Sequence, residues 1–236
     1  MNLAEATSII HSALPQAIDP GQAPEGAMTA LHQIAGDAEV SSFLRATRDD
    51  TTVPFHATRS YRHPLGFDTL LLIEAPPRFR LRMHAWWPYN EPTVEHVHNH
   101  RFAVATKIIL GHYEMKTYQI GPEGSPMSEY RERSSPEEET WSMDHIGVAN
   151  LRVSASTHIG KGSGYALAAD VLHQVWVPQG TMCVTLFLTV PAILDQPRYT
   201  RVFAPEGTWA PEPSQKHVML VGDYQDRLDA IAAELA

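Results

Sequence analysis

The sequence has a single cysteine, Cys183, so no disulfide bond can form within the chain. Its longest apolar runs have the length of a β-strand and fall far short of the about 20 residues that a membrane-spanning helix needs. No amino-terminal stretch combines basic residues with a long apolar segment, as a secretory signal peptide does. We therefore expect a cytoplasmic protein without a membrane-spanning segment, and Cys183, flanked by apolar residues, is expected to be an inert buried thiol.

Positive charge is also scarce. The 236 residues include 18 lysines and arginines against 27 acidic residues, which gives a formal net charge of -9. Because phosphate binding relies on clustered positive charge, we expect no nucleic-acid partner. The sequence also lacks a Gly-x-Ser-x-Gly motif, a phosphate-binding glycine loop, a dinucleotide-binding fingerprint and a Cys-x-x-Cys pair.

Helical periodicity marks both ends of the chain. Residues 2–14 place apolar side chains on one helical face, and Asn2 with Glu5 has the spacing of a capping box. After a linker rich in proline and glycine, residues 27–46 predict two short helices, the second of them capped by Asp37. Residues 223–235 predict a final helix.

From about Thr58 the apolar period changes from helical to twofold, in short segments bounded by proline, glycine and asparagine, which predicts a β-sandwich or barrel. The expected strands cover residues 68–74, 79–87, 96–110, 112–120, 150–158, 164–168, 173–177 and 182–190. Residues 121–144 are acidic and polar, and they predict a mobile excursion that covers the barrel mouth. We expect a helical extension over residues 1–60, a barrel over 61–205 and a tail with a helix over 206–236.

The sequence contains 13 histidines, and three of them alternate at the start of the segment EHVHNHRFAVATKIILG. Successive side chains of a strand point to opposite faces, so His96, His98 and His100 share a face with the apolar side chains that follow. Inward-facing imidazoles are costly unless their nitrogens are satisfied, and a bound metal ion satisfies them. A hydrogen-bonded histidine cluster, or a solvated strand end that turns inward only after His100, would give the same pattern.

Together with a later histidine, this segment resembles a known family. His98-x-His100, then Gly111 at the strand end, and much later His173 before an apolar strand, resemble the two sequence motifs of the cupin superfamily. The resemblance covers about residues 65–190. It implies a mostly β fold, a double-stranded β-helix or jelly-roll barrel, with His98, His100 and His173 as the ligands of one metal ion.

The sequence departs from both motifs. Val104 stands where the first cupin motif usually has a glutamate ligand, and the Pro-x-Gly of the second motif reads Ala168 to Asp170. Three neutral imidazoles leave a divalent ion with its full charge and with open positions, which favours an anionic group on the substrate. Glu95, Glu114 or water could replace the missing ligand.

The all-histidine set is similar to the iron centre of thiol dioxygenases such as cysteine dioxygenase. This resemblance implies Fe(II) as the cofactor, with Zn, Mn, Ni or Cu as alternatives, and dioxygen as a second substrate. The leading hypothesis is a mononuclear oxygenase that acts on a small polar acid or thiol derived from an amino acid. The alternatives are a cupin enzyme without redox chemistry (an isomerase, hydrolase or decarboxylase) and a non-catalytic cupin that binds a small molecule. Because cupins often pair, a homodimer is a further expectation.

Four residues are candidates for substrate binding. Arg80 or Arg82 would hold a carboxylate if the polar face of residues 79–87 lines the barrel, although a solvated face would show the same alternation. Tyr113 could supply a phenol. Neighbours on one strand face lie about 7 Å apart, so His96 and His100, with His98 between them, lie about 14 Å apart. A metal ion with bonds of about 2.0 to 2.1 Å cannot bind both of them. The distance to Gly111 favours His100 as the ligand and leaves His96 at the rim.

Overall fold

The computed structural model describes residues 1–14, 22–63, 65–89, 95–135, 140–190, 199–208, 211 and 214–235. Helices α1 (Leu3–Ala13), α2 (Ala23–Ile34), α3 (Asp37–Arg48) and α4 (Val53–Ala57) precede the strands, and α5 (Val221–Glu234) follows them. Within these residues, no helix combines the length and the hydropathy needed to cross a membrane.

The ends of the first and third helices test the predicted caps. The capping box of α1 is confirmed, because the Asn2 side chain accepts from the Glu5 backbone N–H and the Glu5 carboxylate accepts from the Asn2 backbone N–H. The predicted cap of α3 is wrong by one residue. Gly36 has the extended backbone of an N-cap, and the helix already includes Asp37.

The strands form two antiparallel sheets. Sheet A has the order β13 (His217–Val218), β1 (Tyr61–Arg62), β2 (Asp68–Ala75), β3 (Phe79–Trp86), β10 (Cys183–Val190), β5 (Ala103–Leu110) and β8 (Gly164–Leu167). Sheet B has the order β11 (Arg201–Pro205), β4 (Val97–His98), β9 (Leu172–Trp176), β6 (His112–Ser135), β7 (Thr140–Gly160) and β12 (Ser214–Gln215).

The strand pairs are nested along the chain. The hairpin of β6 with β7 is enclosed by the pair β5 and β8, then by β4 and β9, and finally by β3 and β10. Successive pairs alternate between the two sheets, so one long hairpin is folded over on itself. This is the jelly-roll, or double-stranded β-helix, arrangement. The predicted fold class, a mostly β barrel with amino-terminal helices and a carboxy-terminal helix, is confirmed.

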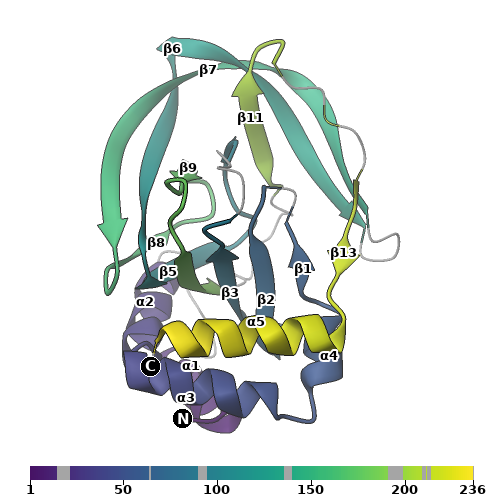
Figure 1. The fold of residues 1–236 in the computed structure, drawn as a ribbon. Helices are drawn as coiled ribbons and strands as arrows, with labels where there is room; N and C mark the ends of the chain where they lie inside the picture. The colour runs from purple at the N-terminus through teal and green to yellow at the C-terminus, as the bar shows by residue number, and fades with distance from the viewer. Residues whose placement is uncertain are drawn as a thin grey trace.

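Sheet A is buried on both faces. The odd-numbered side chains of β3, from Phe79 to Ala85, belong to a core shared with the helices, while Trp86 belongs to a second core inside the barrel. Figure 1 shows the helices gathered along one side of the strands. In the shared core, the Tyr224 hydroxyl of α5 donates a hydrogen bond to the Leu71 carbonyl of β2 at 2.6 Å. Both terminal helical regions therefore pack on the barrel, although the predicted domain boundaries stay predictions.

Two strand predictions were wrong in extent. Residues 96–110, expected as one strand, form β4 and β5 with a break between them. Residues 121–144, expected as a mobile excursion that covers the barrel mouth, lie mostly in β6 and β7, which pair with each other up to Ser135 and Thr140; residues 136–139 lie outside the described residues. The mobility of this segment stays a prediction. The arch that these two strands form opposite the helices is visible in Figure 1.

The glycines of residues 121–144 explain why this segment was not predicted as part of two strands. The register between β6 and β7 shifts between Ile120 and Ser125, so the Gly-Pro-Glu-Gly stretch forms an irregularity within the strand rather than its end. A Cβ on Gly124 would lie 2.5 Å from backbone atoms of Leu151, so the close approach of the two strands requires glycine there. β11 then pairs with β6 along Met127 to Arg131 and extends sheet B.

Candidate metal centre

The three histidines predicted as ligands come together inside the barrel. His98 of β4 and His173 of β9 are direct register partners, and the backbone N–H of His100 donates to the Ala169 carbonyl at 3.2 Å. The candidate ligand atoms of His98, His100 and His173 all lie within 4.8 Å of one another. Small adjustments of the side chains would bring all three to the about 2.0 to 2.1 Å bonds that a metal ion makes with imidazole.

Backbone carbonyls fix the tautomer of two of these rings. Nδ1 of His98 lies 2.9 Å from the His96 carbonyl oxygen, and Nδ1 of His173 lies 3.1 Å from the Val171 carbonyl oxygen. A carbonyl can only accept, so Nδ1 carries the proton in both rings and Nε2 keeps its lone pair. Metal-binding histidines are usually oriented by such a bond from the other nitrogen.

Burial keeps the three rings neutral. It lowers the pKa of His173 to about 3 and the pKa of His98 below its usual value. The pKa of His100 lies well below the usual value, because of burial first and then the neighbouring His173 and His98. The neutral imidazole is the form that binds a metal, so the site is ready for an ion at physiological pH without losing protons.

No carboxylate joins the three histidines among the residues that the structure describes. Glu114 is exposed. Glu95 is buried, but it acts electrostatically on Tyr113 and Tyr165 rather than on the histidines. Val104, in the place of the usual glutamate, is 1% exposed and packs inside the barrel. The donor set is therefore neutral, and it fits the divalent metals that imidazole binds well, namely Zn, Cu, Fe and Ni.

The two candidate arginines have different surroundings. Arg80 forms an ion pair with Glu74 on β2. Arg82 forms no ion pair with any described residue, and its buried Nε has no hydrogen-bond partner. Its positive charge contributes to the lowered pKa of His84 and, as the smallest of the causes, to the lowered pKa of His100. The structure therefore favours Arg82 over Arg80 as a group that faces the site.

Tyr113 and Cys183 lie in the apolar core of the barrel. Tyr113 is 1% exposed, and its hydroxyl donates to the Tyr165 hydroxyl at 2.8 Å. Burial raises the pKa of the Cys183 thiol to about 12, so this thiol is unreactive, as expected. His96 is half-buried, lies outside the three-histidine group and offers its backbone carbonyl to His98.

Sequence reasoning missed an aromatic chain that leads from the metal centre to sheet A. The ring of Phe187 lies 5.4 Å from that of His100 and is stacked on His84 at 4.5 Å. Phe67 lies 4.9 Å from His84 and is stacked on His63 at 4.4 Å. Burial lowers the pKa of His63 to about 3 and the pKa of His84 well below its usual value. The sequence contains one indication of this arrangement, because the alternation in residues 79–87 places His84 on the same face of the strand as Arg82.

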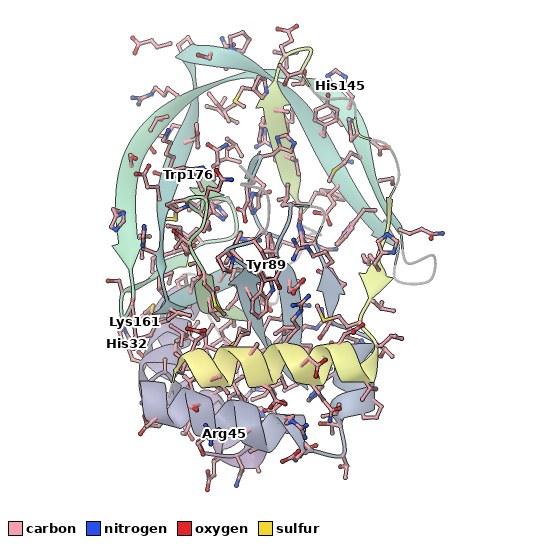
Figure 2. The ribbon with its side chains drawn as sticks, in the orientation of Figure 1. His32, Arg45, Tyr89, His145, Lys161 and Trp176 are labelled. Carbon is pink, nitrogen blue, oxygen red and sulfur yellow. The ribbon has the colours of Figure 1, made fainter. Side chains whose placement is uncertain are left out.

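Other histidines have no role in this arrangement. His32 on α2 and His145 on β7 are exposed, and Figure 2 shows them on distant parts of the molecule.

The nested strand pairs and the three histidines together define the class of protein, a jelly-roll β-barrel with a three-histidine cluster, which is the arrangement that the cupin resemblance implies. No protein-family model and no curated protein sequence matches the chain.

Solved structures of cupins resemble this chain in fold. An RmlC-like cupin from Shewanella frigidimarina is 13% identical with a TM-score of 0.34, over 58% of this chain and 87% of that one. KdgF from a Halomonas species is 8% identical with a TM-score of 0.36, over 57% of this chain and 87% of that one. A hydroquinone 1,2-dioxygenase from a Sphingomonas species is 10% identical with a TM-score of 0.32, over 50% of this chain and 62% of that one.

Proposed function

We propose that this protein is a mononuclear metal-dependent oxygenase that uses Fe(II) and acts on a small polar acid or thiol. The observation that carries the proposal is the convergence of three neutral imidazoles, His173 buried and His98 and His100 half-buried, without a carboxylate among the described residues. Such a set leaves positions for an anionic substrate and for dioxygen. When bound, iron supplies the electron transfer that activates dioxygen.

Each residue of the site has a separate task in this proposal. His98, His100 and His173 hold the ion. Arg82 orients the anionic group of the substrate, and His96 lies at the rim. The ring of Phe187, packed against His100, limits the space beside the ligands and excludes water from it. Arg80 and Tyr113, the other two candidates from the sequence, are engaged by Glu74 and Tyr165 and have no task in the proposal.

Metal content of single variants tests the ligand set. His98→Ala, His100→Ala and His173→Ala should each lose most of the bound metal in elemental analysis, because each removes one of the three proposed ligands. His96→Ala is the matched control and should keep its metal, since His96 lies outside the group. If His96→Ala loses metal while His100→Ala retains it, the ligand assignment is wrong. If none of the four changes the metal content, the protein has no metal centre here.

Oxygen consumption tests the reaction. Protein loaded with Fe(II) should consume dioxygen in an oxygen electrode with one or more amino or mercapto acids, and the three ligand variants should not. Uptake that survives the loss of the ligands would contradict the proposal.

A second candidate is a metalloenzyme without redox chemistry. Three neutral histidines and an open position also suit catalytic zinc, which polarises a carbonyl group or activates water. Full occupancy by zinc after growth in iron-rich medium, with no dioxygen consumption, would favour this candidate. A metal ion with no position accessible to small molecules would instead favour a non-catalytic binding protein.

The cytoplasmic location and the homodimer stay predictions.

A further inference from the structure

Sheet B carries a pair of histidines on its outer face, away from the metal centre. His112 begins β6 and His158 lies near the end of β7, and the centroids of their rings are 4.9 Å apart. The next residues along each strand, Tyr113 and Ile159, are buried and pack inside the barrel. Because successive side chains of a strand point to opposite faces, the two histidines point outward, where His158 is exposed and His112 is half-buried.

The spacing of these two rings matches that of the candidate ligands in the metal centre. The ring centroids of His98, His100 and His173 lie between 4.5 and 5.1 Å apart, so the outer pair falls within the same range. A metal ion bonds to an imidazole nitrogen at about 2.0 to 2.1 Å, and rings at this spacing can bond to one ion. Neither ring of the outer pair forms a hydrogen bond or an ion pair with another described residue, so the nitrogens are available.

Glu114 supplies a carboxylate beside this pair. It is the direct register partner of His158 and follows His112 by two residues on β6, so all three side chains share the outer face. Among the described residues only the metal centre gathers three ligand atoms within 4.8 Å, and Glu114 has to turn toward the two rings to join them. It is free to turn, because it is exposed and forms no ion pair with a described residue. Lys116 lies beyond it, on the side away from His112.

This set of donors suits a divalent transition-metal ion. Zinc takes histidine nitrogens and glutamate oxygens in tetrahedral geometry, with water in a position that the protein leaves open. Unlike the neutral set inside the barrel, two imidazoles and a carboxylate compensate one unit of the charge of the ion. A site on the outer face also exchanges its ion directly with solvent, so it is filled only while the ion is present in solution.

We infer that His112, His158 and Glu114 form a second metal site, open to solvent, that binds Zn(II) or a similar divalent transition-metal ion. The inference does not depend on the proposed function, because these side chains lie outside the barrel interior.

Calorimetric titration with Zn(II) tests the second site on the full chain, after its metal has been removed with EDTA. The parent protein should bind one equivalent more than His158→Ala or His112→Ala. Glu114→Gln should weaken the binding of that equivalent by at least about tenfold, a loss that even an indirect partner of a metal site causes. His145→Ala is the matched control and should bind like the parent protein, because His145 is exposed on β7 but its ring contacts Tyr130 and no histidine of the described chain.

Trp176 provides a signal from the site itself. Trp176 of β9, labelled in Figure 2, is exposed and is the register partner of Glu114 on the side opposite His158. Cu(II) quenches the fluorescence of an indole close to it. In His173→Ala, whose metal centre lacks one proposed ligand, Cu(II) should still quench the fluorescence. Adding Trp176→Phe should remove most of the quenching and keep the binding in calorimetry, whereas adding His158→Ala should remove both.

The outcomes distinguish the second site from the metal centre. If His158→Ala or His112→Ala binds as many equivalents of Zn(II) as the parent protein, the second site is refuted. A single equivalent that is lost in His173→Ala and kept in His158→Ala would refute the second site and leave the metal centre intact. A single equivalent that is lost in His158→Ala and kept in His173→Ala would support the second site and refute the metal centre on which the proposed function rests.

Discussion

Replacing Glu95 by glutamine measures the cost of a carboxyl group buried inside the barrel. Glu95 is 6% exposed. Burial raises its pKa from 4.5 to about 8, against the opposing effect of a backbone hydrogen bond from Val175. The folded protein therefore keeps this proton up to about pH 8, whereas the unfolded chain releases it near pH 4.5. The stability linked to this group is fully present below about pH 4.5 and is lost as the pH rises through about 8.

The size of the effect follows from the two pKa values. At about 1.36 kcal/mol per pKa unit, the difference between 4.5 and about 8 corresponds to at most about 5 kcal/mol. Glutamine carries no titrating proton, so Glu95→Gln should match the parent protein near pH 4.5 and should exceed its free energy of unfolding by about 2 to 5 kcal/mol at pH 8.

Urea unfolding of both proteins at intervals between pH 4.5 and pH 8 checks this prediction. The difference between the two free energies of unfolding isolates Glu95, because the buried histidines contribute equally to both. Glu114→Gln is the control, since Glu114 is exposed and its replacement should leave the pH dependence unchanged. Parallel curves for Glu95→Gln and the parent protein would refute the reasoning.

Two further predictions concern packing. Tyr224→Phe should lower the free energy of unfolding by about 1 kcal/mol in urea, because it removes the donor to the Leu71 carbonyl, and an unchanged midpoint would contradict that role. Gly124→Ala should lower the melting temperature, because its Cβ would lie 2.5 Å from the backbone of Leu151, whereas Gly121→Ala has open space around it and should cost little. Equal melting temperatures for the two alanine variants would contradict the close approach.

The sequence was sufficient for the fold class because short strand-sized segments bounded by proline, glycine and asparagine follow one another along the barrel, even where β2 and β10 are buried along most or all of their length and show no twofold period. The sequence did not show where the polar face of β3 lies. Arg82 and His84 alternate with apolar residues there, and a face toward solvent was as good an interpretation as a face toward the barrel interior. The helices cover one face of sheet A and sheet B covers the other, so the odd-numbered side chains of β3 are buried and Arg82 and His84 are half-buried rather than solvated. Only the tertiary arrangement could reveal this.

The candidate ligand histidines were predictable because the spacing of His98 and His100 is local and the resemblance to the cupin motifs adds His173. The residues on the facing sheet were not predictable in this way. Thr69 and Thr185 lie far apart in the sequence, and they flank His84 only through the register of three strands. A strand pattern assigns a face to each side chain, but it does not say which residues of other strands lie beside it.

The nested strand pairing also has a consequence for the order of folding. Strands β6 and β7 follow each other in the chain, so they pair over a short sequence separation. The pair β4 and β9, which brings His98 beside His173, joins segments that are separated by β5, β6, β7 and β8. Non-local contacts of this kind cost more loop-closure entropy and form slowly. Metal affinity should therefore arise late in refolding, after most of the strand signal in circular dichroism, and a metal-binding phase that precedes that signal would show that the histidines meet before the barrel does.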